Sequence, residues 1–268
     1  MTKVASSFCL LFLVLSFTLF GQAQDSREVR KTGEFVQNGR VSIDTYKGSI
    51  KVFTWDKSEI EIVARIEPDG WDRHSRERVE DTEIRIDLSS NSARIKTDYD
   101  RVRDRHSGFL GIFGDDDSGN LPLVNYTIKV PKTTSLRIKD YKSKTEVNDL
   151  ESDIDIETYK GEVEVGRLSG SLALDTYKGE ARIAFARLSG KSRFETYKGT
   201  VDISLPRGKG FELDADIGRH GSFDSDFAVE RNRRRSRSSD TEIRSAINGG
   251  GPLVRLKTDH GTIRLLER

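Results

Sequence analysis

A four-residue motif, Thr-Tyr-Lys-Gly, recurs along this 268-residue chain and constrains its fold more than any other feature. It is complete at residues 45–48, 158–161, 176–179 and 196–199, altered to Asp-Tyr-Lys-Ser at 140–143, and diverged to Thr-Asp-His-Gly at 258–261. The tyrosines of the four central copies are 18, 18 and 20 residues apart. A repeat with so short a period indicates a fold built from stacked units.

Each unit has the pattern of strand, turn, strand and second turn. Apolar residues alternate with polar ones before the motif, at Ile154 and Ile156, and after it, at Val163 and Val165. This period of two is typical of strands with one buried face. We expect the motif glycine to supply the positive φ of a tight turn, and residues 168–170 to form the second turn.

A unit of this length cannot bury its apolar face alone, so neighbouring units must cover it. An antiparallel meander is one alternative, but Tyr-Lys-Gly is a poor hairpin turn. Parallel stacking at a strand spacing of ~4.8 Å keeps successive units alike, because each residue then lies on its own counterpart. The sequence therefore favours an all-β fold, a single-chain parallel β-helix or β-solenoid with coils of 18–20 residues.

The first 23 residues differ from the rest and predict a signal peptide. Lys3 precedes an apolar stretch over residues 8–20, and the small residues Gly21 and Ala23 suit cleavage after Ala23. An uncleaved anchor helix is the alternative, although the apolar stretch is short for a membrane span.

Residues 24–133 are expected to form a less regular, β-rich N-terminal part of the same adhesin-like domain. Strands are predicted at 41–52, 60–66, 82–88 and 126–130, with polar loops at 69–80 and 98–120 and no helix of usable length. Residues 134–268 are expected to hold the β-solenoid repeats and a C-terminal cap.

The apolar and charged fractions agree with a thin core, and the cysteine content agrees with a location outside the cytoplasm. Hydrophobic residues make up 34% of the chain and charged residues 33%, which suits many strands with one wet face. Cys9 is the only cysteine and precedes the cleavage point, so the mature chain would have no disulfide and no thiolate metal site. Basic and acidic residues nearly balance, so no global field favours nucleic acid. We expect an exported bacterial protein that is periplasmic, outer-surface or secreted.

Several segments resemble a known family. They are residues 39–52, Trp55 with Asp56, residues 124–131, the 18-residue repeats, and residues 247–252 with Gly261. Together they resemble the bacterial adhesin-like family catalogued as DUF4097, a β-helical adhesin-like domain. The resemblance implies an exported or surface β-helical protein, and the family has no established catalytic residues to carry over.

No catalytic constellation is visible in the sequence. The histidines at 74, 106, 220 and 260 have no metal-ligand spacing, and neither a nucleophile elbow nor a phosphate-binding loop occurs. Residues 115–117 are three aspartates that suit Ca²⁺ or a solvated loop. The basic run at 231–237 suits phosphate or sulfate groups, or an exposed loop. We predict a protein that is not an enzyme and has no cofactor or metal.

The repeat itself provides the candidate ligand-binding residues. Stacked units would align Tyr141, Tyr159, Tyr177 and Tyr197, with Lys142, Lys160, Lys178 and Lys198 beside them. One interpretation is structural: a self-stacking aromatic ladder whose lysines are partly offset by the acidic column Glu157, Asp175 and Glu195. The other is functional: a flat aromatic and cationic strip suited to a sugar polymer.

The leading hypothesis is a non-catalytic, exported, adhesin-like protein that binds surface glycan or another cell-envelope partner through a repeat face. A carbohydrate-active β-helix enzyme is one alternative. An envelope-stress or scaffold accessory protein that acts through protein partners is another. We expect no nucleic-acid partner and no transmembrane span after signal cleavage.

Overall fold

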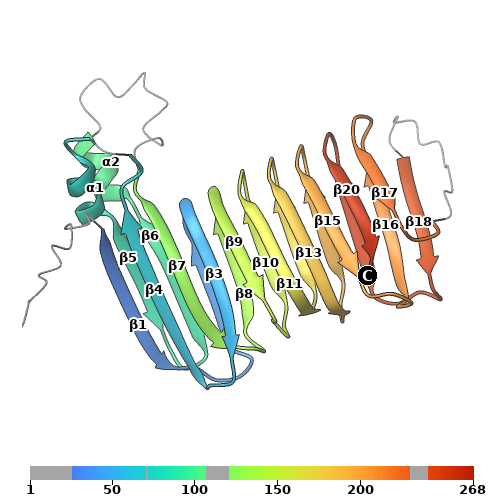
Figure 1. Ribbon diagram of the computed structural model, residues 1–268, viewed down its shortest axis with the longest axis horizontal. Helices are drawn as coiled ribbons and strands as arrows, with labels where there is room; N and C mark the ends of the chain where they lie inside the picture. The colour runs from blue at the N-terminus through green and yellow to red at the C-terminus, as the bar shows by residue number, and fades with distance from the viewer. Residues whose placement is uncertain (1–25, 71, 107–120, 230–240) are drawn as a thin grey trace, which may run out of the picture.

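Two large β-sheets make up most of the protein (Figure 1). The computed structural model describes residues 26–70, 72–106, 121–229 and 241–268. Within them, each sheet has ten strands. The predicted signal peptide and the two charged segments at 115–117 and 231–237 lie outside the described residues.

The strands of one sheet, here sheet A, are given in spatial order. They are β1 (Arg27–Glu34), β4 (Glu59–Glu67), β7 (Leu123–Pro131), β3 (Lys47–Trp55), β9 (Lys142–Asn148), β11 (Glu162–Gly170), β13 (Glu180–Leu188), β15 (Thr200–Leu205), β20 (Thr262–Glu267) and β17 (Ser222–Ser225).

The strands of sheet B are given in spatial order from the same end of the molecule. Its strands are β5 (Glu83–Leu88), β6 (Ser92–Asp98), β2 (Arg40–Asp44), β8 (Ser135–Asp140), β10 (Ile154–Thr158), β12 (Leu172–Thr176), β14 (Ser192–Thr196), β19 (Leu253–Thr258), β16 (Phe211–Ile217) and β18 (Thr241–Ile247).

The repeat motifs connect the sheets. At each motif the chain leaves sheet B and enters sheet A, as from β10 to β11 and from β12 to β13. Neighbouring units pair in parallel, so that Thr158 lies beside Thr176 in sheet B and Val163 beside Ala181 in sheet A. The register of β11 and β13 shifts only after Val165, at an irregularity near Leu168. Like residues therefore lie on like residues through the central units.

The order of the units in space differs from their order in sequence. The copy at 45–48 lies beside the copy at 140–143, because β2 pairs with β8 and β3 with β9. The diverged copy at 258–261 lies beside the copy at 196–199, because β14 pairs with β19 and β15 with β20. All six copies thus form one continuous stack.

The predicted all-β class is confirmed, but the sheets are mixed rather than uniformly parallel. The pairs β1–β4, β4–β7 and β5–β6 at one end, and β16–β18 at the other, are antiparallel. The regular parallel β-helix is therefore not confirmed as a description of the whole chain. Antiparallel strands lie at both ends of sheet B and at one end of sheet A, where they replace the parallel edge that a further unit would extend. The other edge strand of sheet A, β17, pairs in parallel with β20.

The core is a thin layer between the sheets. Ile156, Leu174, Phe194 and Leu256 come from neighbouring strands of sheet B, and each is fully buried. Inward residues of sheet A, such as Val201, belong to the same cluster. Alternate residues on both sheets face water, which agrees with the balance of apolar and charged residues.

Two short helices were not predicted. They are α1 (Ser75–Asp81) and α2 (Asp100–His106), and they lie together at one end of the sheets (Figure 1). Seven residues are too few for an amphipathic pattern to stand out. Local polar contacts hold them instead: Asp72 bonds Arg78 of α1, and Asp98 accepts the backbone N–H of Asp100 at 2.8 Å.

The motif glycines serve two purposes. Gly48 has the expected positive φ, 127°, whereas the glycines of the central units do not have positive φ. A Cβ on Gly179 would lie 2.1 Å from the carbonyl oxygen of Gly161, and one on Gly199 would lie 2.2 Å from that of Gly179. Glycine is therefore required because the backbones of neighbouring units approach closely at this corner.

We predict that Gly179→Ala lowers the free energy of unfolding by ~2–3 kcal/mol, since the added methyl group must push neighbouring backbones apart. Gly190→Ala is the matched control, because its Cβ would meet only the Ser171 side chain, at 3.3 Å. Chemical denaturation measures both. Equal losses in the two variants would contradict the close-approach explanation.

Asp140 is a buried departure from the repeat. It lies in register with Thr158, whose Oγ1 donates to its Oδ1 at 2.8 Å, and the Ser143 N–H donates to the same oxygen at 3.1 Å. Its Oδ2 has no hydrogen-bond partner among the described residues. Burial raises the pKa of the Asp140 carboxyl from 3.8 to about 6, against the lowering effect of these two bonds.

Because the folded-state pKa is raised, the protonated carboxyl favours folding. This contribution is fully present below about pH 4 and is lost as pH rises through about 6. We expect Asp140→Asn to remove a pH dependence of up to ~3 kcal/mol between pH 4 and pH 7. Denaturation at both pH values checks this, with the half-exposed Asp155→Asn as control. An unchanged pH dependence in Asp140→Asn would contradict the assignment.

Candidate functional site

Five tyrosines stack ring on ring along one corner of the molecule. Tyr46, Tyr141, Tyr159, Tyr177 and Tyr197 follow one another with centroid separations of 4.6, 4.9, 4.6 and 5.0 Å. Successive ring planes differ by only 3–12°. We call this set the tyrosine ladder. It contains the four tyrosines predicted from the repeat and adds Tyr46.

Backbone hydrogen bonds between units hold the ladder in register. The third residue of each motif donates its N–H to the carbonyl oxygen of the tyrosine in the neighbouring unit of the stack. The donors are Lys142 to Tyr46, Lys160 to Tyr141, Lys178 to Tyr159, Lys198 to Tyr177 and His260 to Tyr197, all at 2.8–2.9 Å. Within a unit, the motif threonine accepts the glycine N–H, as between Thr158 and Gly161 at 2.9 Å. The same bond forms at Thr196 and Thr258, whereas the Thr176 hydroxyl has no partner among the described residues.

Other aromatic rings close both ends of the ladder. Tyr99 meets Tyr46 edge-on, with centroids 6.4 Å apart. At the far end, the His260 ring lies 5.0 Å from Tyr197, and His220 lies 5.0 Å from His260. His260 was detectable as part of the diverged copy, whereas His220 lies outside any motif and carries no such signal.

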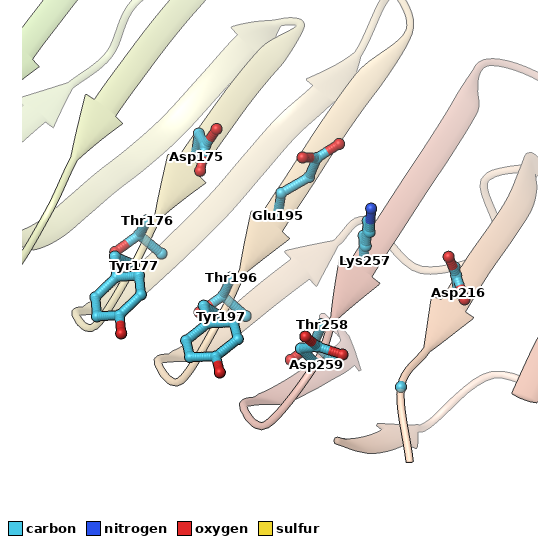
Figure 2. Close-up of a pocket in the computed structure, with 11 residues that line it drawn as sticks. Asp175, Thr176, Tyr177, Glu195, Thr196, Tyr197, Asp216, Lys257, Thr258 and Asp259 are labelled. Atoms are coloured by element: carbon cyan, nitrogen blue, oxygen red, sulfur yellow. The ribbon is translucent and has the colours of Figure 1, made fainter. Parts of the chain in front are cut away.

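The ladder is accessible along its edge. Tyr159 and Tyr177 are each 38% exposed, and the other three tyrosines are half-buried. Because each ring covers the face of the next, water meets ring edges and hydroxyl groups, and Figure 2 shows the hydroxyls of Tyr177 and Tyr197 pointing away from the strands. The expected flat aromatic strip is therefore wrong: the site offers a line of phenol groups.

Four lysines run beside the ladder. Lys142, Lys160, Lys178 and Lys198, here the lysine row, are all exposed. The Lys160 ammonium lies 5.4 Å from the Tyr159 ring centre, and that of Lys198 lies 5.6 Å from the Tyr197 ring centre. The equivalent Lys47 differs, because it is buried and pairs with Asp69 at 2.6 Å.

The acidic column does not pair with the lysine row. Glu157 pairs with Arg137 at 3.2 Å, and Glu195 pairs with Arg193 at 3.3 Å. Asp175 lies between them, and burial, followed by the nearby Glu195 charge, raises the pKa of its carboxyl. We expected this acidic column to offset the charge of the lysine row, but its carboxylates make no direct contact with those lysines among the described residues.

An acidic cleft of about 470 Å³ lies at the His260 end of the ladder (Figure 2). Its charged lining consists of Asp175, Glu195, Asp216, Asp259 and Lys257. Asp259 occupies the place that tyrosine has in the other motifs. Across the described ranges, no three His, Cys, Asp or Glu side chains are grouped to hold a metal ion.

The remaining sequence candidates are scattered. His74 lies 3.5 Å from Glu77 near α1, outside the repeat motifs. The side chain of His106 lies outside the described set. In the part of the chain that the structure describes, no helix is long and apolar enough to cross a membrane.

We predict that Tyr159→Ala with Tyr177→Ala lowers the free energy of unfolding by ~1–4 kcal/mol, because three stacked pairs are lost. The matched Tyr→Phe changes keep the rings and should stay close to the parent protein. Thermal and chemical denaturation measure both. A loss in the Phe variant as large as in the Ala variant would show that ring stacking is not what the tyrosines contribute.

The chain is similar to solved structures of other bacterial proteins. A putative cell adhesion protein from Clostridium sporogenes has 10% identity and a TM-score of 0.48, covering 91% of this chain and 100% of its own. A putative adhesin from Bacteroides fragilis has 13% identity and a TM-score of 0.36, covering 90% and 97%. None of the curated proteins matches the chain.

The family comparison covers nearly the whole chain. The Toastrack DUF4097 family matches residues 22–266, which include every strand described above except the last residue of β20. The chain belongs to the Toastrack DUF4097 family.

Proposed function

We propose that this protein is a non-catalytic, exported binding protein of the cell envelope. Its binding surface is the corner formed by the tyrosine ladder and the lysine row, and its partner is a surface glycan or another extended envelope component. The observation that carries the proposal is the exposed, in-register line of phenol hydroxyls and ammonium groups.

Export and the finer description of the fold belong to the same proposal. The charged and apolar pattern of residues 1–23 supports secretion to the periplasm, outer surface or medium. The in-register parallel pairs of the central units support their description as coils of a β-solenoid. Such a repetitive surface suits a partner that is itself extended.

A purely structural ladder would not need these polar groups. Stacking uses the rings, which phenylalanine would also supply. The lysines are not required to complete the fold either, since they are exposed and Lys47 shows that the same position can be buried and paired. Phenol and ammonium groups instead donate hydrogen bonds and positive charge outward.

The corner is suited to binding more than to catalysis. Its repeated groups orient a ligand, and they are the same in each unit, whereas a catalytic site needs differentiated groups around one reacting bond. A carbohydrate-active enzyme would instead use the acidic cleft, because carboxylates gather there at one end of the ladder.

We expect Tyr159→Phe with Tyr177→Phe to weaken binding to surface polysaccharide by about 5- to 30-fold, through loss of two hydrogen bonds. Retention on immobilised bacterial polysaccharides, neutral and acidic, measures this. Thr200→Ala with Thr262→Ala is the control, since it removes two half-buried hydroxyls from sheet A. Failure of the parent protein to bind any polysaccharide, or release of sugar fragments by it, would refute the proposal.

A further inference from the structure

The lysine row is distinguished from other basic residues of the protein because its four lysines are aligned in successive units and none of them has an acidic partner in the part of the chain that the structure describes. On the sheet faces, many outward basic residues pair with carboxylates on the same or a neighbouring strand. Examples are Lys51 with Glu146 at 3.6 Å, Arg264 with Asp202 at 2.6 Å and Arg255 with Asp214 at 2.8 Å. In the described residues, none of the four lysines of the row forms an ion pair.

The row also has a fixed spacing. Each of its lysines donates its N–H to a ladder tyrosine of the preceding unit, and the rings beside them stack. Since neighbouring strands are ~4.8 Å apart, the attachment points of the four side chains span about 15 Å. Like charges at neighbouring positions repel, so the row is an unneutralised cationic array.

We propose, building on the proposed function, that the partner is an unbranched anionic glycan with about one acidic group per sugar. It lies along the stack of units, with its acidic groups on Lys142, Lys160, Lys178 and Lys198. A sugar ring linked through opposite carbons is about as long as the strand spacing of ~4.8 Å, so consecutive acidic groups meet consecutive lysines. The phenol hydroxyls beside the row donate to sugar oxygens.

Charges at both ends limit the length of this site. On one side the next motif lysine, Lys47, is buried against Asp69. On the other side, Asp259 and Asp216 of the acidic cleft would repel an anion. The favourable footprint is therefore four acidic groups.

The chemistry of lysine does not select one acidic group. An ammonium binds carboxylate or phosphate as a point charge, without the fixed two-pronged geometry of arginine. A uronic acid polymer satisfies both the charge and the spacing arguments. A sugar–phosphate polymer satisfies the charge argument alone, because a phosphodiester between the rings lengthens its repeat. The experiment has an arm for each.

The test measures binding by calorimetry with four probes: oligogalacturonates of two to ten units, a teichoic acid with glycosyl phosphate repeats, neutral cello-oligosaccharides and a single-stranded oligonucleotide. Lys142→Gln, Lys160→Gln, Lys178→Gln and Lys198→Gln are combined in one variant. The control combines Lys31→Gln, Lys57→Gln, Lys191→Gln and Lys209→Gln, four exposed lysines that are not aligned and form no ion pair among the described residues.

We expect the row variant to bind at least one acidic glycan about 30-fold more weakly than the parent, and the control to stay within about 3-fold. Affinity should fall with added salt and rise with oligomer length up to about four units before levelling off. Melting temperatures should match between the two variants. The acidic glycan bound more tightly identifies the acidic group.

Several results would overturn the inference. Equal losses in the row variant and the control would show that net charge matters and alignment does not. Tighter binding to the oligonucleotide than to either glycan would exclude a glycan as the partner. Binding of neutral cello-oligosaccharides with no preference for acidic glycans would refute this inference but leave the proposed function intact. Binding of no sugar polymer would refute both.

Discussion

The close approach of neighbouring units at the Thr-Tyr-Lys-Gly corner is the constraint on which the rest of the structure depends. The lysine N–H bonds the tyrosine carbonyl of the preceding unit, and at Gly179 and Gly199 only a glycine allows the backbones to come so near. These contacts fix the position of each unit on the next. The alignment of core residues, tyrosines and lysines follows from that single register.

Parallel register places every residue beside its own counterpart, which has opposite consequences for different side chains. Tyrosines gain from it, because rings stack on rings at 4.6–5.0 Å. Lysines and glutamates lose from it, because like charges become neighbours. Arginines neutralise carboxylates of the acidic column, as at Glu157 and Glu195, whereas the lysine row has no ion pairs among the described residues. The acidic column is thus neutralised within the fold, and the lysine row keeps its charge unpaired in the described part of the chain.

Much of the fold and of the tyrosine ladder could be predicted from the sequence, because similar units that recur at a short period are expected to stack on one another. The period gave the alternating strands, the parallel pairing of central units and the aligned tyrosines. It could not show that residues 45–48 lie against 140–143, since a long insertion separates the two copies. Nor could it give the antiparallel ends or the short helices, which depend on pairing and local polar contacts without periodicity.

The ring orientation illustrates a second limit of the sequence. Alternation correctly placed the tyrosines on the outside, but outward residues can present either faces or edges. Whether faces or edges are exposed depends on the distance between the rings. Rings on adjacent strands lie close enough to cover one another, so stacking buries their faces. What remains available to a ligand is therefore set by the same register that builds the core. Departures from the motif then define the extent of the site, because Lys47 is buried at one end and Asp259 replaces tyrosine at the other.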